Sequence, residues 1–243
     1  MTTTLTSLEL HRGIRYADLD ARQRALAEAA RAGAPGRLLL SEVLPVITRG
    51  RRAPDTTPLL LPDAQLALQG IEIYPTDRGG FDTYHGPGQW VIFPVDRLEA
   101  LCGDSRGVRK TVEALLSAAL EVGLLYDPTA HIREGAETGA WTSRGKFAAV
   151  GVHIERGVLL HGMAINAYRT ATSFVGLRPC GLDAPVDFLL EGPGRPLGDE
   201  GFEAGVGERG GFGFGAHDIV IGHSSKSLRG VRRKIDGGRK KAR

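Results

Sequence analysis

Hydrophobic and polar residues recur with the period of a helix in two stretches of the chain. Residues 17–33 read ADLDARQRALAEAARAG, which gathers leucines and alanines on one face and charged residues on the other. This pattern predicts an amphipathic helix that Asp18 or Asp20 caps and Gly33 ends. Residues 107–125 read GVRKTVEALLSAALEVGLL and predict a second helix. Its apolar face comprises Val108, Val112, Leu115, Leu116, Ala119 and Leu120.

Shorter apolar runs predict β-strands. We expect strands at residues 37–43, 71–77 and 89–95, and a loop at the proline-rich residues 51–62. Residues 146–167 read KFAAVGVHIERGVLLHGMAINA, which predicts two strands around the turn ERG. Because helices and strands do not alternate as regular βαβ units, the pattern predicts an α+β fold with a mixed or antiparallel sheet.

One stretch, residues 77–90, fits neither period. It reads DRGGFDTYHGPGQW and holds four glycines and one proline. Glycine lets the backbone approach a ligand or another strand closely, and proline removes a hydrogen-bond donor. We therefore predict a shaped loop here rather than a regular strand or helix.

Composition places the chain among ordinary globular proteins. Hydrophobic residues make up 42% of its 243 positions and charged residues 24%, which is close to average usage. The two cysteines, Cys102 and Cys180, do not form the framework of a secreted disulfide protein. The N-terminal residues lack the apolar core of an export signal, and no apolar run is long enough to cross a bilayer. We therefore expect a soluble, cytoplasmic protein with no membrane partner.

The composition changes at about residue 192. Residues 192–216 are dominated by glycine, with too few large apolar side chains to offset the entropy of ordering them. We predict a folded domain over residues 1–191 and a flexible segment with a basic tail over residues 192–243, in which residues 217–222 form an isolated strand. The last nineteen residues carry a net charge of +8, and subtracting this from the total of +3 leaves −5 on the rest. A solvated tail is the default interpretation, phosphate binding or docking to an acidic protein are alternatives, and nucleic acid is not an expected partner.

Two residues are candidates for covalent chemistry. Cys180 lies between a proline and a glycine in LRPCGL, at a predicted turn, where it is either a reactive thiolate or an inert structural residue. Lys146 begins an otherwise apolar strand, where it either extends toward solvent or faces Cys180. A lysine beside a cysteine thiolate would support acyl transfer through a thioester.

Metal and nucleotide sites find little support in the sequence. His85, His153 and His161 are too far apart for a local zinc motif, and Cys180 has no CxxC partner. We expect each histidine to bond the backbone or orient a loop. The glycine pairs of GERGGFGFGA have no strand before them and no helix after them, and the chain contains no P-loop.

Three sequence blocks occur in the order in which one protein family carries them. They are DRGGFDTYHGPGQWVIFP (77–94), GKFAAVGVHIERGVLLHGMAIN (145–166) and LRPCGL (177–182). Together they resemble the lipoyl(octanoyl) transferases, the octanoyltransferases of lipoate biosynthesis. The resemblance runs from about residue 8 to about residue 190, and SEVLPVITRGRR (41–52) resembles the family's upstream strand and loop.

The resemblance implies a fold and an activity. The fold is the mixed-sheet α+β domain of biotin and lipoate ligases. The activity moves an octanoyl group from acyl carrier protein to a lysine of a lipoyl domain, as found in 2-oxoacid dehydrogenases and the glycine cleavage H protein. The thioester donor is already activated, so neither a cofactor nor a metal is expected.

The resemblance also implies roles for residues. Cys180 matches the nucleophile of the family, and Lys146 matches the lysine that lowers the pKa of that cysteine and shuttles protons. Three segments match those that bind the acyl chain, and the glycine loop would form one wall of its channel. They comprise Arg78, Gly79, Gly80, Phe81, Asp82, Thr83, Tyr84 and His85; Ala149, Val150 and Gly151; and Gly162, Met163 and Ala164.

Some positions depart from the family pattern, and three alternatives stay open. The usual EHPPVYT reads EVLPVIT here, with Val43 and Leu44 in place of the histidine and first proline. One alternative is a divergent paralogue with another acyl group or acceptor. Another is an ATP-dependent ligase of the same fold class, although no adenylate-binding loop is recognisable. The third is a non-catalytic module that binds an acyl group or a partner.

Overall fold

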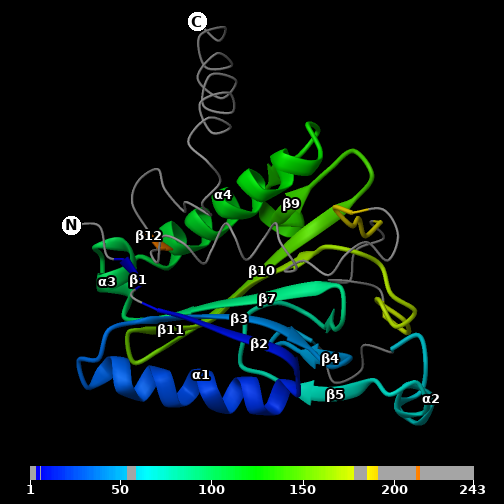
Figure 1. Cartoon of the computed structure of the whole chain (residues 1–243), viewed down its shortest axis with the longest axis horizontal. Helices are drawn as coiled ribbons and strands as arrows, with labels where there is room; N and C mark the ends of the chain where they lie inside the picture. The colour runs from blue at the N-terminus through cyan, green and yellow to red at the C-terminus, as the bar shows by residue number, and fades with distance from the viewer. Residues whose placement is uncertain (1–3, 6, 54–58, 178–184, 191–211, 214–243) are drawn as a thin grey trace, which may run out of the picture.

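The computed structural model describes residues 4–5, 7–53, 59–177, 185–190 and 212–213 (Figure 1). A mixed seven-stranded sheet forms its centre, in the strand order β2-β3-β7-β11-β10-β9-β8. β2 and β3 run parallel, and the other neighbouring pairs are antiparallel. The strands are β2 (Leu8–Ile14), β3 (Arg37–Val43), β7 (Gln89–Val95), β8 (His131–Arg133), β9 (Gly139–Trp141), β10 (Lys146–Glu155) and β11 (Val158–Asn166).

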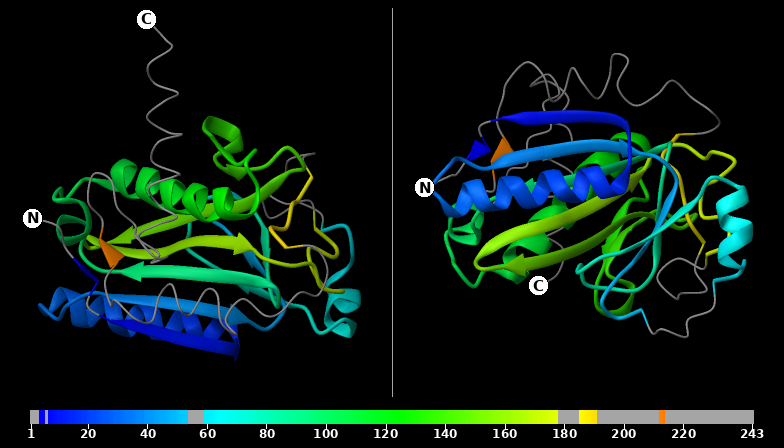
Figure 2. Two further views of the ribbon diagram at one scale, coloured as in Figure 1. Left: turned by 45° about the horizontal axis from the view of Figure 1, so that its top comes forward. Right: turned by 90° about the horizontal axis from the view of Figure 1, so that it is seen from below.

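A long helix covers each face of this sheet (Figure 2). On one face, α1 (Tyr16–Arg31) buries Leu19 in a cluster that includes Phe93 of β7. On the other face, α4 (Val108–Tyr126) buries Leu115 in a larger apolar cluster with side chains of β10 and β11. The sheet is thus the middle layer of three, and burial of both its faces supplies most of the hydrophobic stabilisation.

A smaller three-stranded sheet adjoins the first, in the order β5-β4-β6 (Figure 1). β4 (Val46–Arg49) pairs in parallel with β5 (Glu72–Pro75) and antiparallel with β6 (Thr83–His85). The buried side chains of Ile47 and Leu66 share a separate core here. The remaining elements are α2 (Asp63–Leu68), α3 (Leu98–Cys102), the 3-10 helix η1 (Gly135–Glu137), and the ladder of β1 (Thr4–Leu5) with β12 (Phe212–Gly213).

The sequence pattern located the main elements correctly. The α+β class with a mixed sheet is confirmed. The helices predicted at 17–33 and 107–125 are α1 and α4, and the strands predicted at 37–43 and 89–95 coincide with β3 and β7. The hairpin predicted over 146–167 is β10 and β11, joined at the expected turn.

The predicted capping of α1 is wrong at its first residue. Its N-cap is Arg15, which makes no side-chain cap hydrogen bond, and Asp18 lies inside the first turn. Asp20 instead bonds side chains of its own helix. Gly33 follows the end of the helix with a φ of 96°, a conformation that favours glycine.

Two other details of the prediction need correction. The stretch 77–90 is not entirely loop, because Thr83–His85 form β6 through pairing with β4, a contact that local pattern cannot reveal. Val108 was placed on the buried face of α4 but is 37% exposed, since it is the first residue of the helix. The predicted isolated strand at 217–222 lies outside the described residues.

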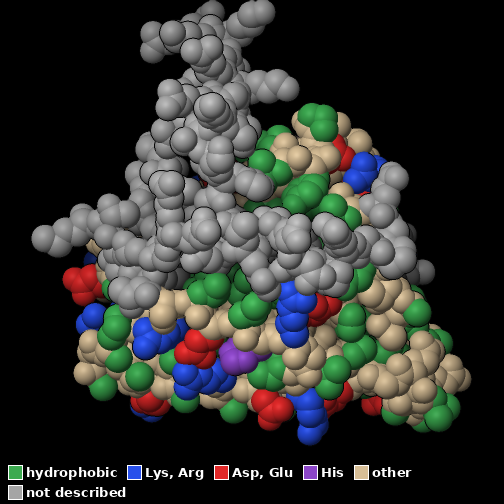
Figure 3. Space-filling model, in the orientation of Figure 1, with side chains coloured by type: hydrophobic (Ala, Val, Ile, Leu, Met, Phe, Trp, Pro, Cys, Tyr) green, Lys and Arg blue, Asp and Glu red, His purple; other side chains and the backbone are tan. Residues whose placement is uncertain are grey.

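The described surface mixes charges of both signs. Figure 3 shows basic and acidic side chains intermingled over the side that carries β2 and α1. Arg22 of α1, for example, makes a two-pronged ion pair with Glu9 of β2, at 2.6 and 2.8 Å. Among the described residues, no helix has the length and apolar character needed to span a membrane.

Candidate active site

The structure brings the three predicted acyl-binding segments together. Residues 149–151 of β10 pair with residues 162–164 of β11, so that the two segments face each other across one hairpin. The third segment, residues 78–85, reaches this hairpin at Gly79, whose N–H donates to the carbonyl of Val152 at 3.0 Å. Segments that are far apart in the sequence therefore meet at β10.

Arg78 holds the glycine loop from inside and is only 6% exposed. Its Nε and Nη2 donate to Oγ1 of Thr48, at 3.2 and 2.8 Å, and Nη2 also donates to the Thr48 carbonyl at 2.7 Å. Its Nη1 donates to the carbonyls of Gly79 and Phe81, at 3.1 and 2.8 Å. The planar guanidinium thus ties the loop to β4 in a way that a lysine could not reproduce.

Glycines allow the loop to approach its neighbours closely. A Cβ atom at Gly50 would lie 2.4 Å from the carbonyl oxygen of Gly80, and one at Gly151 would lie 3.3 Å from that of Gly79. A contact of 2.4 Å is impossible for a real side chain. The backbone of the loop therefore lies close to that of Gly50 and of β10, with no room for side chains between them.

The middle of the loop combines one exposed and one buried side chain. Phe81 is 40% exposed, and the Arg52 guanidinium lies over its ring at 5.3 Å from the centroid. Asp82 is 4% exposed, with Oδ2 at 3.9 Å from Nε of Arg49 and no hydrogen-bond partner for Oδ1 among the described residues. Burial raises the pKa of Asp82 above its usual value. Thr83 follows as the first residue of β6 and is half-buried.

Tyr84 fixes the loop from the core of the small sheet. It is 1% exposed and packs in the cluster of Ile47 and Leu66. Its hydroxyl forms a hydrogen bond of 2.7 Å with Oγ1 of Thr172. Its burial and this hydrogen bond fasten the loop to the small sheet.

His85 is a buried neutral ring. It stacks on Tyr16, with centroids 5.6 Å apart and an angle of 9° between the planes, and its Nδ1 bonds Oε1 of Gln89 at 2.6 Å. Burial, followed by the nearby Arg78 guanidinium, lowers the pKa of His85 to about 3. Because the Gln89 oxygen can only accept, the Nδ1 of this neutral ring carries the hydrogen.

Lys146 is held against the protein at the start of β10. Its Nζ donates to the carbonyl of Thr138 at 2.8 Å and lies 5.7 Å from the centroid of the Trp141 ring. A Cβ at Gly139 would lie 2.2 Å from Cε of Lys146, so the glycine makes room for the lysine side chain. The expected alternative, a strand-end lysine that simply extends into solvent, does not describe this geometry.

The backbone of Lys146 pairs with the segment that follows the predicted nucleophile. Its N–H donates to the carbonyl of Pro185 at 2.9 Å, and its carbonyl accepts from the N–H of Asp187 at 3.0 Å. Cys180 itself belongs to residues 178–184, outside the described residues. Its predicted role therefore stays a prediction.

Charged side chains near the start of β10 occur in pairs. Asp187 accepts from Nε of Arg144 at 2.9 Å, and Nη1 of Arg144 donates to Asp127 at 2.8 Å. On the other side, Arg133 and Glu137 form an ion pair of 3.3 Å. In each of these contacts, a basic side chain lies against an acidic one.

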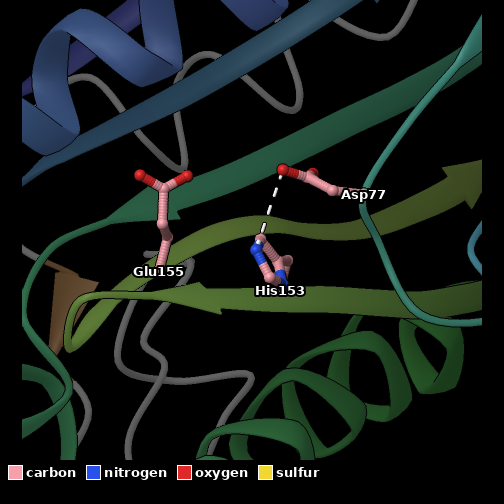
Figure 4. A group of neighbouring side chains, drawn as sticks. All are labelled: Asp77, His153 and Glu155. Carbon is pink, nitrogen blue, oxygen red and sulfur yellow. Dashed lines mark ion pairs between the residues drawn. The ribbon is translucent and has the colours of Figure 1, made fainter.

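A second charged cluster lies beside α1, just before the glycine loop. Asp77 accepts from Nε2 of His161 at 2.6 Å and from Nη2 of Arg24 at 2.9 Å. His153 lies 3.7 Å from the same carboxylate, as the dashed line in Figure 4 marks, and Nη1 of Arg24 lies 3.4 Å from Glu155. The hydrogen bond from His161, followed by the one from Arg24, holds the pKa of Asp77 well below its usual value.

This cluster has the residue types of a metal site but is already neutralised. Ligand atoms of Asp77, His153 and Glu155 lie within 4.8 Å of one another. Arg24 pairs with both carboxylates, and Arg31 donates to Glu155 at 3.1 Å. The two guanidinium groups supply the positive charge that a cation would bring, so we interpret the cluster as an ion-pair network that anchors the loop.

His161 connects this network to the buried face of α1. It has a φ of 60°, which is uncommon for a residue with a side chain. Its Nδ1 lies 3.2 Å from Nε2 of Gln23, and its N–H donates to Oε1 of the same glutamine at 2.8 Å. Nε2 of Gln23 also donates to Asp20 at 2.6 Å. His161 therefore bonds side chains rather than the backbone, and it orients the residue that precedes Arg78.

Sequence reasoning missed two buried amides, Gln89 and Asn166, which are 4% and 5% exposed. Gln89 is the first residue of β7, and Asn166 is the last residue of β11. Together they connect the loop to Lys146. A signal was present, since each is a polar residue at the boundary of an apolar run, in QWVIFPV and GMAIN. What they bond could not be read from that signal.

Comparison with known proteins gives a consistent result. A family model described as the lipoyl protein ligase A/B catalytic domain matches residues 15–206. The chain is 39% identical over 164 residues to an octanoyltransferase of Alkaliphilus metalliredigens, covering 66% of this chain and 72% of that protein. It is 37% identical over 194 residues to an octanoyltransferase of Mycobacterium ulcerans, covering 76% and 78% of the two chains.

A solved structure shares the fold at low sequence identity. The structure of a protein described as a candidate lipoate protein ligase from T. acidophilum matches with a TM-score of 0.50 and 14% identity. The match covers 66% of this chain and 68% of that one. At this identity the likeness concerns the fold alone, and it confirms the predicted ligase-like α+β architecture.

Proposed function

Because this chain belongs to the octanoyltransferases of the lipoyl protein ligase A/B catalytic domain family, we propose that it transfers an octanoyl group from acyl carrier protein to a lysine of a lipoyl domain. Cys180 carries the octanoyl group as a thioester between the two half-reactions, and Lys146 acts as the acid and base. The acceptors are the lipoyl domains of 2-oxoacid dehydrogenases or the glycine cleavage H protein.

The observation that carries this proposal is the pairing of Lys146 with the segment after Cys180. Pro185, whose carbonyl accepts from the Lys146 N–H at 2.9 Å, follows Cys180 by five residues. At no more than about 3.6 Å for each residue, covalent connectivity keeps Cys180 within about 18 Å of Pro185. On the other side, Leu177 is buried in the small-sheet core with Tyr84 of the acyl loop. The described residues before and after Cys180 thus contact the core of the loop and the predicted lysine, which supports the proposal.

The meeting of the three predicted segments supports an acyl-binding role for them. Residues 149–151 and 162–164 consist mainly of glycine and alanine, whose small side chains let backbone lie close to a straight hydrocarbon chain. Burying each methylene of that chain gains about 0.8 kcal/mol. Arg78 shapes the third segment from beneath through its hydrogen bonds to Thr48 and to the loop carbonyls.

The proposed chemistry balances over two steps. The Cys180 thiolate attacks the carbonyl carbon of the donor thioester, the bond to the carrier's sulfur breaks, and that sulfur takes a proton from the Lys146 ammonium. The amine of the lipoyl-domain lysine then attacks the acyl-enzyme and forms an amide. Its proton goes to the neutral Lys146 amine, and the Cys180 thiolate leaves. Both groups return to their starting charge.

The test is intact-mass measurement of the full chain after incubation with octanoyl-carrier protein, without acceptor or ATP. We expect the wild-type protein to gain one octanoyl mass and Cys180→Ser to gain none. Cys102→Ser is the matched control and should keep the adduct. Cys102 is the last residue of α3, and its Sγ lies 3.2 Å from the carbonyl of Leu98. Adding a lipoyl domain should remove the adduct and leave an octanoyl amide on the domain.

Two results would overturn the proposal. An adduct that survives Cys180→Ser would place the nucleophile elsewhere. ATP–pyrophosphate exchange in the presence of free octanoate, with no adduct from the carrier thioester, would show an ATP-dependent ligase instead.

A further inference from the structure

Two buried side-chain amides, those of Gln89 and Asn166, connect residues 78–85 of the glycine loop to Lys146. Gln89 and Asn166 are directly opposite each other in the register of β7 and β11. Nε2 of Gln89 donates to Oδ1 of Asn166 at 2.8 Å. Both side chains lie almost entirely out of solvent, where an amide must be bonded to be tolerated.

Gln89 fastens the end of residues 78–85 of the glycine loop. Its Oε1 accepts from Nδ1 of His85 at 2.6 Å, and its Nε2 also donates to the carbonyl of Tyr84 at 3.2 Å. These are the last two residues of β6. One side chain therefore holds both the ring of His85 and the backbone of the strand that ends the loop.

Asn166 fastens the region around Lys146. Its Nδ2 donates to the carbonyl of Asp187 at 3.1 Å and lies 3.4 Å from the carbonyl of Lys146. Its backbone carbonyl accepts from the N–H of Leu189 at 3.2 Å. Asn166 thus bonds both the first residue of β10 and the returning segment 185–190 that follows Cys180.

We propose that Gln89 and Asn166 are positioning residues that hold the lysine and the segment after the cysteine in register with the acyl-binding loop. This inference rests on the proposed function, because it concerns the geometry of the same transfer. Neither amide touches the reacting atoms in the proposal. They act through His85, through the Lys146 backbone and through Asp187.

A small displacement of the lysine has a large effect on such a reaction. A misplacement of about 1 Å can lower a rate about a hundredfold, because the reacting groups lose their alignment. Displacing the ammonium from a thiolate also makes the thiolate harder to form, which moves its titration to higher pH. A side chain with only a structural role would lower stability without moving that titration.

The chain offers a matched control for this distinction in Gln23. It is also a fully buried glutamine, and its side chain also takes part in three hydrogen bonds, two with His161 and one with Asp20. It lies on the α1 side of the sheet, away from Lys146. Replacing each glutamine with methionine removes bonds of similar number and changes the volume little.

The experiment measures the melting temperature of the full chain, and two rates between pH 5 and pH 9, in the variants Gln89→Met, Asn166→Leu, their double variant and Gln23→Met. One is the rate of acyl-enzyme formation with octanoyl-carrier protein. The other is the rate of Cys180 alkylation by iodoacetamide, separated from that of Cys102 by peptide mass. The alkylation rate reports on the cysteine without requiring acyl transfer.

We expect Asn166→Leu and Gln89→Met to slow acyl-enzyme formation at pH 7 by about tenfold or more and to move the alkylation midpoint to higher pH. The double variant should be little worse than the more severe single variant, because the two amides act as one unit. Gln23→Met should lower the melting temperature about as much as Gln89→Met does. Its alkylation midpoint should stay at the wild-type pH.

The inference is overturned if the Asn166 and Gln89 variants keep the wild-type alkylation midpoint, as the Gln23 variant does. A double variant whose effect is the sum of independent single effects would equally count against a joined bridge. Absence of any octanoyl adduct on the wild-type protein would instead overturn the proposed function, and the alkylation profiles would then decide the positioning role alone.

Discussion

Two hydrogen-bond networks border the glycine loop, and they differ in charge. On the α1 side, Asp77 is joined to Arg24 and His161, so that network consists largely of charged groups. On the side of Lys146, Gln89 and Asn166 are neutral amides. The charged network lies directly before the loop, and the amide network lies directly after it.

The two networks also differ in contact with solvent. The side chains of Arg24 and Asp77 are 41% and 30% exposed, so water and salt weaken their attraction. Gln89 and Asn166 are nearly inaccessible, so each broken bond leaves a buried polar atom without a partner. The charged network is suited to fastening the loop to a helix, whereas the amide network is suited to fixing distances between backbone segments.

The largest expected effect is at Arg78, which begins the loop between the two networks. Arg78→Met would leave buried carbonyls and the Thr48 hydroxyl without their donor, so we expect a loss of about 3 kcal/mol or more in the free energy of unfolding. Urea unfolding followed by tryptophan fluorescence measures it, since Trp90 and Trp141 are both buried. Arg78→Lys is the control, and it should recover only part of the loss because an ammonium cannot form the same fork. A loss below about 0.5 kcal/mol would show that the loop does not depend on this anchor.

The charged network is tested by Asp77→Asn, with an expected loss of about 2 kcal/mol at pH 7. The folded protein depresses the pKa of Asp77, so its contribution is fully present above pH of about 4 and disappears as the pH falls further. Urea unfolding at pH 7 and pH 3 should therefore show a large difference from wild type at pH 7 and a smaller one at pH 3. Equal differences at both pH values would contradict this account.

The amide network is tested at the residue that titrates beside it, His85. Its folded-state pKa of about 3 is below the unfolded value of about 6.5, so the unfolded chain binds a proton that the folded chain refuses. Stability from this group is present above pH 6.5 and is lost as the pH falls toward 3. His85→Asn keeps a donor for Gln89 but does not titrate, and its stability should fall less steeply in this window. If the stability of His85→Asn fell as steeply as that of wild type between pH of about 6.5 and about 3, other groups would account for the pH dependence.

The smallest effect is expected at an exposed ion pair, which serves as the reference for both networks. Arg22 and Glu9 are paired at 2.6 Å, with side chains 45% and 21% exposed. Glu9→Gln should cost less than about 1 kcal/mol, and the cost should shrink in 1 M salt. Urea unfolding at low and high salt measures both quantities. A cost as large as that of Asp77→Asn would remove the distinction between the exposed pair and the anchoring network.

Local pattern was sufficient where one periodicity continued over many residues. The helical repeat of α1 and α4 and the apolar runs of β3 and β7 were found within two residues of their observed bounds. It failed for short elements such as β6 and β8, whose three residues each are strands only because a partner lies beside them. It also failed at the start of α1, where Asp20 bonds neighbouring side chains instead of capping the helix.

The candidate site divides in the same way. The identities of Cys180 and Lys146, and of the glycine-rich and alanine-rich segments, followed from sequence blocks that resemble one family. The bonds of Gln89 and Asn166, and the guanidinium fork of Arg78, did not, because their partners lie far away in the chain. The number of possible pairings between distant polar residues is too large for composition or spacing to select one.

The sequence by itself determined the fold class, the main helices and strands, the family and the residue types available for acyl transfer, because these depend on local periodicity and on contiguous motifs. Only the tertiary structure decided that the three predicted acyl-binding segments meet at β10 and that Lys146 pairs with the segment after Cys180. The physical reason is that burial leaves a polar group no water to bond. Each such group must find a partner across the fold, and the packing of the sheet determines which partner that is.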